Sequence, residues 1–196
     1  MARTREFDTE AVVDAAMEVF WSRGYEATSI QHLVEATGIG RGSLYAAFGS
    51  KDGLYEAALA RYAAASTARM ADRLDRDEPV RTVLRDLLLS LVDDTATDPA
   101  KRGCLMTNTA VERLPHDPTA GRIVGDAFDR IAESVTAALR RARARGELPS
   151  DADVTALADF VVTTIQGLRV QGKTGADRRR LASVVDTALH ALPAPA

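Results

Sequence analysis

The stretch that decides the fold is residues 28–51, TSIQHLVEATGIGRGSLYAAFGSK. Its apolar residues recur at helical spacing on both sides of a glycine-containing break, which predicts two short helices joined by a tight turn. Thr28, followed three residues later by Gln31, fits a capping box that would start the first helix. Gly38 suits the left-handed conformation that commonly ends a helix. Helix, glycine turn and helix are together typical of a helix-turn-helix, whose second helix can enter the DNA major groove.

These residues and their neighbours carry a resemblance. The stretch, with the end of the preceding helix and the start of the following one, resembles the DNA-binding domain of the TetR family of bacterial transcriptional regulators. The matching residues are Phe20, Gly24, Tyr25, Thr28, Ser29, Ile30, Gly38, Ile39, Ser43, Leu44, Tyr45, Phe48, Lys51 and Leu54. The close match covers roughly the first quarter of the chain. Many relatives carry aromatic or histidine residues where this chain has Ala46 and Ala47, so fewer large side chains are available to reach bases.

Apolar residues at helical spacing continue to the C-terminus, so the expected fold class is all-α. The resemblance implies a three-helix, helix-turn-helix DNA-binding domain over residues 1–50. It also implies a larger helical ligand-binding and dimerisation domain over residues 51–196, with about nine helices in all. The chain is 46% hydrophobic but only 5% aromatic, and its many Ala and Leu residues favour helices.

The formal net charge of −3 is unusual for a protein that binds DNA. Residues 1–51 hold five basic and seven acidic residues, so this part of the chain has no basic excess either. DNA binding therefore requires local placement of charge. We expect Arg3, Arg5, Arg41 and Lys51 to face DNA and the acidic side chains to lie on other faces. The acidic balance argues against a DNA-packaging protein.

Seven residues are candidates for DNA contact, because they lie near a helix start or on the outer face of the second short helix. They are Thr28, Ser29, Arg41, Gly42, Ser43, Tyr45 and Lys51. Helix N-termini favour phosphates, and hydroxyl groups can bond phosphate oxygens. Arg41 is the candidate for reading guanine, and Gly42 would let the backbone approach DNA. Taken singly, Tyr45 could instead be a packing residue and Arg41 a solvated charge.

The last two predicted helices carry wide apolar stripes. The first stripe comprises Val154, Leu157, Ala158, Val161, Val162, Ile165 and Leu168. The second comprises Leu181, Val184, Val185, Ala188, Leu189 and Leu192. Pairing this hairpin with its copy would form a four-helix bundle across a two-fold axis. The resemblance also implies a homodimer through these helices, and a monomer that buries both stripes internally is the alternative.

The resemblance implies a cavity in the larger domain that binds a small apolar or amphipathic molecule. The residues expected to line it are Leu87, Leu91, Met106, Phe128, Ile131 and Phe160. Each of them could equally be an ordinary core residue, because apolar residues at helical spacing form the core face of a helix. Few charged residues interrupt these stripes, so a polyanionic ligand is not expected.

The sole cysteine, Cys104, suggests a second way of sensing. A thiolate reacts with oxidants and electrophiles, and a nearby cation or helix N-terminus lowers the thiol pKa. Lys101 and Arg102 precede Cys104, and Lys173 lies in the turn between the last two predicted helices. Some relatives with a similar Gly-Cys-Leu segment respond to electrophiles, which implies that modification of Cys104 releases DNA. The alternative is an inert, buried side chain.

These observations favour a dimeric DNA-binding transcriptional regulator, most simply a repressor released from a palindromic operator of double-stranded DNA by a small apolar ligand. One alternative is a repressor switched by an electrophile at Cys104. An alternative of another class is a helical binding protein without regulatory DNA binding.

Catalysis, a metal site and a cofactor are not expected. The histidines His32, His116 and His190 are scattered, and the sequence has no nucleophile–base motif and no glycine-rich phosphate loop. The single cysteine suits a reducing compartment. The charged N-terminus is unlike a signal peptide, and no apolar run is long enough to span a membrane. A cytoplasmic protein is therefore expected.

Overall fold

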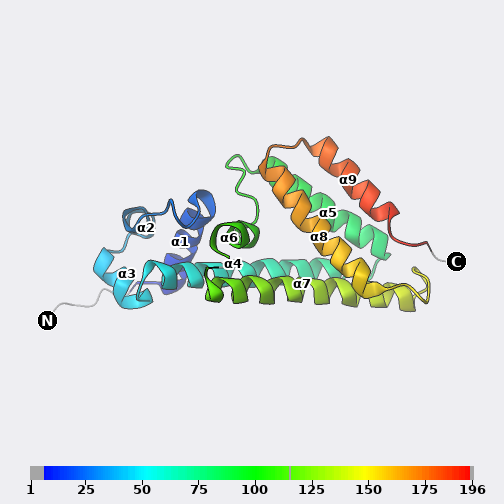
Figure 1. The fold of residues 1–196 in the computed structure, drawn as a ribbon, viewed down its shortest axis with the longest axis horizontal. Coiled ribbons are helices and arrows are strands. Elements are labelled where there is room, and N and C mark those ends of the chain that lie inside the picture. The colour runs from blue at the N-terminus through cyan, green and yellow to red at the C-terminus, as the bar shows by residue number, and fades with distance from the viewer. Residues whose placement is uncertain (1–6, 115, 195–196) are drawn as a thin grey trace.

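The computed structural model describes residues 7–114 and 116–194, and within them the chain forms nine α-helices and no strands (Figure 1). The all-α expectation is therefore confirmed. The helices are α1 (Thr9–Arg23), α2 (Ile30–Thr37), α3 (Arg41–Phe48), α4 (Lys51–Leu74), α5 (Val80–Thr97), α6 (Leu105–Arg113), α7 (Pro118–Ala144), α8 (Val154–Lys173) and α9 (Arg178–His190).

Helices α1, α2 and α3 form the N-terminal unit, and α2 and α3 are joined by the predicted glycine turn. Phe20, Leu33 and Leu44, one from each helix, are buried in its core. Gly38 has φ 70° and ends α2 in the left-handed conformation, as expected. The two short helices thus meet at an angle that only a residue tolerant of positive φ allows without strain.

The predicted cap of α2 is wrong by one residue. Ser29, not Thr28, is the N-cap, because its backbone is extended and its hydroxyl accepts a hydrogen bond from the His32 N–H. His32 takes the place expected for Gln31, and its Nδ1 accepts from the Ser29 N–H at 3.1 Å. Thr28 lies just outside the helix, where its hydroxyl donates to the Gly24 carbonyl at 2.6 Å.

The long helices α4 and α7 run side by side along the longest axis of the molecule (Figure 1). Ser50 caps α4, as expected, by accepting from the Gly53 N–H. The N-terminal part of α4 packs on α1 and α3, whereas its later turns pack on α5 and α7. Helix α4 is therefore shared between the N-terminal unit and the rest of the chain.

Helix α8 packs against α5 and α7, and α9 packs against α5 and α8. Their inner faces bury most of the predicted stripes. Their outer faces remain partly apolar, since Phe160 and Val170 on α8 are 40% and 46% exposed and Val184 on α9 is 44% exposed. Among the helices of residues 7–114 and 116–194, none has the length and apolarity that a membrane crossing requires.

Candidate nucleic-acid interface and pocket

The outer face of α3 carries the predicted DNA-reading residues. Leu44 and Phe48 turn toward the core because they lie four residues apart on one side of the helix. This register leaves Arg41 exposed and Tyr45 39% exposed. The Arg41 guanidinium lies 5.6 Å from the centre of the Tyr45 ring, so the two side chains sit together on the same surface. A phenol and a guanidinium offer donors for both phosphates and base edges.

The start of α3 is open for a backbone contact. Gly40 is its N-cap and supplies no side-chain hydrogen bond, Gly42 is exposed, and Ser43 is half-buried. The first N–H groups of a helix without a side-chain cap favour anions, including phosphate.

The other three predicted DNA contacts lie at the starts of α2 and α4, and one of them, Thr28, is placed differently. Thr28 is only 1% exposed and its hydroxyl is engaged by a backbone carbonyl, so the expectation that it contacts a phosphate is wrong. Ser29 is exposed beside it and accepts the capping hydrogen bond of α2. Lys51 opens α4, and its ammonium lies 4.0 Å from the centre of the Tyr25 ring.

Acidic residues of α1 are paired away from α3. Asp14 accepts from Arg61 of α4 at 2.8 Å, and Glu18 pairs with Arg102. These ion pairs neutralise two carboxylates on a face of α1 that lies away from α3. The acidic side chains were expected to lie on faces that do not contact DNA. The predicted basic arm, Arg3 and Arg5, lies outside the described residues.

Helix α6 is hydrogen bonded to the turn between α1 and α2. The Glu112 carboxylate accepts hydrogen bonds from the N–H groups of Tyr25 and Glu26, each at 2.9 Å. The next residue, Arg113, places its guanidinium 3.6 Å from the centre of the Tyr25 ring and donates to Asp52 at 2.9 Å. A movement of α6 would therefore change the contacts of the turn that leads into α2.

Tyr25 links three elements through its hydroxyl and ring. The hydroxyl donates to Asp52 at 2.6 Å. Burial, together with the neighbouring Asp52 carboxylate, raises the pKa of Tyr25 to about 12. The same hydrogen bond is the main reason that the pKa of Asp52 lies below its ordinary value. The phenol is thus held protonated and the carboxylate ionised.

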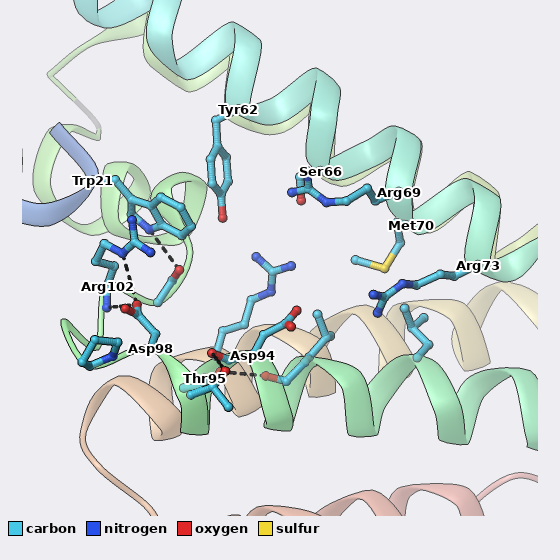
Figure 2. A pocket seen from close by; sticks show the side chains of 16 residues that line it. Trp21, Tyr62, Ser66, Arg69, Met70, Arg73, Asp94, Thr95, Asp98 and Arg102 are labelled. Carbon is cyan, nitrogen blue, oxygen red and sulfur yellow. Dashed lines mark hydrogen bonds and ion pairs between the residues drawn. The ribbon is translucent and has the colours of Figure 1, made fainter. Parts of the chain in front are cut away.

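A pocket of about 370 Å³ lies where α1, α4, α5, α8 and residues 98–103 meet. In Figure 2, Tyr62, Arg69 and Met70 extend from α4, with Asp94 and Thr95 of α5 on the opposite side. Its full lining is Trp21, Tyr62, Ser66, Arg69, Met70, Arg73, Leu87, Leu91, Asp94, Thr95, Thr97, Asp98, Pro99, Arg102, Gly103 and Arg169. This pocket is large enough for a small ligand.

The lining differs from the predicted one. Leu87 and Leu91 lie in the pocket wall, and their contact with a ligand stays a prediction. Met106 and Ile131 are 0% and 1% exposed in the core, and Phe160 lies on the outer face of α8. Periodicity marks all of these as apolar helix positions but does not separate a wall from a core.

Two further features separate this pocket from the predicted set of lining residues. Phe128 packs, half-buried, against the core and is not among the lining residues. The wall is also not mainly apolar, because four arginines and two aspartates line it.

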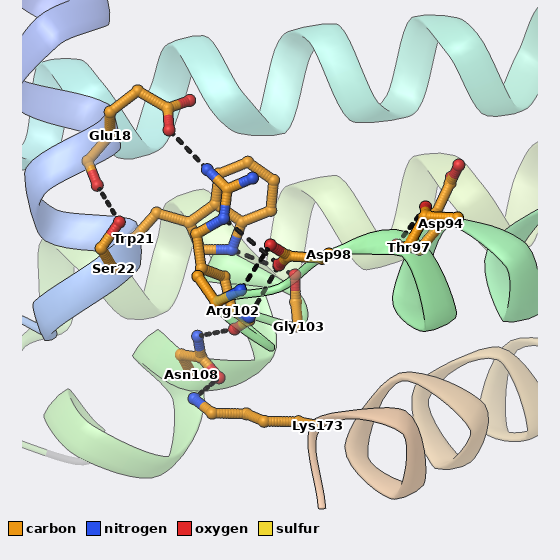
Figure 3. A network of polar contacts seen from close by, with 11 residues as sticks. Glu18, Trp21, Ser22, Asp94, Thr97, Asp98, Arg102, Gly103, Asn108 and Lys173 are labelled. Carbon is orange, nitrogen blue, oxygen red and sulfur yellow. Dashed lines mark hydrogen bonds and ion pairs between the residues drawn. The ribbon is translucent and has the colours of Figure 1, made fainter. Parts of the chain in front are cut away.

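The segment before α6 ties the pocket wall to α1 (Figure 3). The Trp21 indole N–H donates to the Gly103 carbonyl at 3.0 Å. The Arg102 guanidinium lies 4.1 Å from the Trp21 ring and also pairs with Asp98 at 3.2 Å and with Glu18. Because α1 belongs to the N-terminal unit, one wall of the pocket is part of that unit.

Cys104 is the N-cap residue of α6 and is 2% exposed. It lines a second pocket with Lys173, whose ammonium donates to Asn108 at 2.9 Å (Figure 3). Burial raises the pKa of the Cys104 thiol, but the charge of Arg169, with smaller contributions from Thr107 and Tyr62, lowers it by more. The pKa of this thiol is therefore below its ordinary value. Within the described residues, no group of three or more possible metal ligands occurs.

Two models of known families match the chain. Bacterial regulatory proteins of the tetR family match residues 12–58, and the tetracyclin repressor-like C-terminal domain matches residues 80–188. The second match alone spans more than half of the chain. The chain belongs to the TetR family of bacterial transcriptional regulators. The N-terminal match contains the whole helix-turn-helix, which includes α2 and α3.

Individual TetR family members are similar over nearly the full length. The HTH-type transcriptional regulator YezE of Bacillus subtilis is 34% identical, over 98% of this chain and 100% of YezE. The HTH-type transcriptional repressor ComR of Escherichia coli is 33% identical, over 97% of this chain and 91% of ComR. A cysteine mutant of the TetR family regulator CifR, complexed with 26-base-pair double-strand operator DNA, is 37% identical with a TM-score of 0.87, over 98% of this chain and 100% of the CifR chain.

In this TetR family chain, the site residues predicted from the sequence do not include Trp21, Glu112 or Arg169. Arg169 had a usable signal, because it lies four residues after Ile165 and so interrupts the buried stripe of α8 with a charge. Trp21 and Glu112 had no such signal in the sequence. Trp21 bonds to Gly103, and Glu112 bonds to the backbone of residues 25–26, and each pair is distant in sequence.

Proposed function

We propose that this protein is a homodimeric repressor that binds a palindromic operator through α3 and is released when a small molecule occupies the pocket. The observation that carries the proposal is the uncovered face of α3, which presents Arg41 and Tyr45 together. The operator complex of CifR and the repressor ComR support it by similarity. In this proposal residues 1–50 form the DNA-binding domain and residues 51–196 the regulatory domain.

The proposed roles follow the geometry of α3. Arg41 reads a guanine through O6 and N7, and Tyr45 and Ser43 bond phosphate oxygens. Gly42 allows close approach of the backbone, while Ser29 and Lys51 lie beside phosphates on either side.

The proposed dimer is formed by α8 and α9. On α8 an uncharged stripe remains exposed at helical spacing: Ala156, Phe160, Thr163, Gly167 and Val170. On α9 the corresponding exposed positions include Val184 and Thr187, and Ala191, which caps the helix, continues them. Packing these faces against a second copy would form a four-helix bundle and hold two α3 helices at a fixed separation.

Release requires only that the ligand binds better to a conformation in which the α3 helices no longer fit the operator. The pocket is suited to this role because Trp21, in α1, forms part of its wall and is hydrogen bonded to Gly103. A ligand there contacts both units of the chain at once.

The test is selection of bound duplexes from a random DNA pool, followed by affinity measurement on the recovered sequence. We expect a palindrome. Replacing Arg41 with Ala should weaken binding by about tenfold or more, because a good arginine–guanine contact contributes about 1–3 kcal/mol of discrimination. Arg122→Ala is the matched control, since Arg122 is exposed on α7 and pairs with Asp126 of its own helix. Recovery of no common motif would favour the helical binding protein without regulatory DNA binding.

A second candidate mechanism is release by an electrophile at Cys104. The specific observation is a lowered thiol pKa beside Arg169, in the wall of a pocket. N-ethylmaleimide tests it, because the thiolate sulfur bonds to one alkene carbon and water supplies a proton to the other. Operator release by the reagent in the wild type and not in Cys104→Ser would support this mechanism. Equal release in both would contradict it.

A further inference from the structure

The residues that line the pocket between α4 and α5 carry more positive than negative charge. Four arginines line it against two aspartates. One aspartate, Asp98, is fully engaged, since it accepts from the Arg102 backbone at 2.8 Å and from the Arg102 side chain at 3.2 Å. The remaining arginines, Arg69, Arg73 and Arg169, line the pocket together with one other carboxylate, that of Asp94.

Arg169 is the innermost of these cations. Its Nε is shielded from solvent and has no hydrogen-bond partner among the described residues. A buried donor without a partner costs free energy, and a guanidinium is a fork of five N–H donors that matches a carboxylate side-on. The fold therefore leaves one donor unsatisfied on a guanidinium that lines the pocket.

Apolar and aromatic side chains form another part of the wall. Met70, Leu87 and Leu91 supply aliphatic surface, and Trp21 and Tyr62 contribute aromatic rings that pack edge to face at 5.0 Å. A ligand that fits both parts has an apolar body and one anionic head. The volume of about 370 Å³ limits it to a small molecule.

We propose that the pocket binds a small amphipathic carboxylate, with the carboxylate on Arg169 and its apolar body between Trp21 and Leu91. Arg69, exposed at the α4 edge of the pocket, adds a second positive charge. This inference rests on the proposed function for its consequence, operator release, and specifies the chemical class of the releasing molecule. It narrows the apolar or amphipathic ligand implied by the resemblance to an amphipathic anion.

Binding can be followed through Trp21, because it is the only tryptophan of the chain and lies in the pocket wall. The probes are benzoate and hexanoate, each compared with its neutral amide, and inorganic phosphate as an anion without an apolar body. The expected result is a saturable change in tryptophan emission with at least one carboxylate. The matching amide should bind at least about tenfold more weakly, because charge-assisted hydrogen bonds are about twice as strong as neutral ones. Phosphate should also bind at least about tenfold more weakly, because it has no apolar body.

Variants locate the site. Arg169→Gln and Arg69→Gln should each weaken carboxylate binding, by about tenfold for Arg169 and less for Arg69 because it is exposed. Arg69 and Arg169 both line the proposed carboxylate pocket, whereas Arg169 but not Arg69 lines the pocket of Cys104. An effect of both variants therefore distinguishes the two pockets. Arg85→Gln is the control, since Arg85 pairs with Asp186 outside the pocket. Thermal unfolding checks the fold of each variant, and Arg69→Gln keeps the test decisive if Arg169→Gln unfolds.

Three results would overturn the assignment: amides that bind as tightly as their acids, no response of Trp21 to any of the carboxylates, or unchanged affinity in folded arginine variants. Operator binding is measured separately by the anisotropy of labelled DNA. Carboxylates that bind at Trp21 without releasing the operator would leave the pocket assignment standing and contradict ligand release. Operator binding by a protein whose Trp21 emission responds to none of the carboxylates would contradict the pocket assignment and leave the proposed DNA binding standing.

Discussion

At the scale of single residues, Glu112 is the side chain that joins α6 to the DNA-binding unit. Replacing it with Ala removes the acceptor of two N–H groups, of Tyr25 and Glu26. We expect a loss of about 1–3 kcal/mol in the free energy of unfolding, because a partly buried donor is left without a partner. Denaturant titration measures it. Glu133→Ala, an exposed change on α7, should stay within about 0.5 kcal/mol of the wild type.

Tyr25 gives a prediction about alkaline stability. Its pKa is about 12 in the folded protein against an ordinary value of 10.0. Below pH 10 the phenol is protonated in both states; above it the unfolded state loses the proton first, so the free energy of unfolding should fall until about pH 12. Tyr25→Phe should lose this part of the pH dependence. Denaturant titrations from pH 9 to 12 test the difference, and identical slopes in both proteins would contradict the assignment.

At the scale of helices, the contact between α5 and α8 depends on Gly172. A Cβ atom at this position would overlap the side chain of Thr95 on α5. Gly172→Ala should therefore push the two helices apart and cost about 1–3 kcal/mol, as overpacking usually does. The control is Gly125→Ala on α7, where a Cβ meets nothing within 4 Å. This second change should be stabilising, by up to about 1 kcal/mol, because Ala favours a helix over Gly. Equal effects of the two changes on thermal unfolding would be inconsistent with a tight α5–α8 contact.

At the scale of the whole molecule, the proposed dimer makes a prediction about assembly. Phe160→Asp and Val184→Asp each place a charge among the exposed uncharged positions of α8 and α9 that form the proposed interface. Burying an unpaired charge is strongly unfavourable, so both variants should be monomeric and should lose operator affinity. Light scattering measures the mass. Val111→Asp is the control, because Val111 is 82% exposed on α6 and lies outside the proposed interface. A wild-type monomer would refute the arrangement of paired α3 helices.

Local signals in the sequence were sufficient for the helix-turn-helix. Gly38 takes the left-handed conformation, Ser50 caps α4, and Leu44 points inward, each for a reason that lies within one helix or turn. The errors there concern Thr28. It was predicted as the cap in place of Ser29 because both residue types are good caps and only the backbone conformation distinguishes them. It was also predicted to contact a phosphate, but its hydroxyl is bonded to the Gly24 carbonyl.

The chemistry of the pocket was decided by tertiary structure. Periodicity identified Leu91 and Ile131 alike as apolar helix positions, but packing placed Leu91 in a wall and Ile131 in the core. Arg69, Arg169 and Trp21 come from α4, α8 and α1, and no spacing along the chain relates them. The sequence by itself determined an all-helical chain with a DNA-reading unit, since those features depend on neighbouring residues. Only the folded chain set the charge of the cavity, because that charge is the sum of side chains that meet from distant helices.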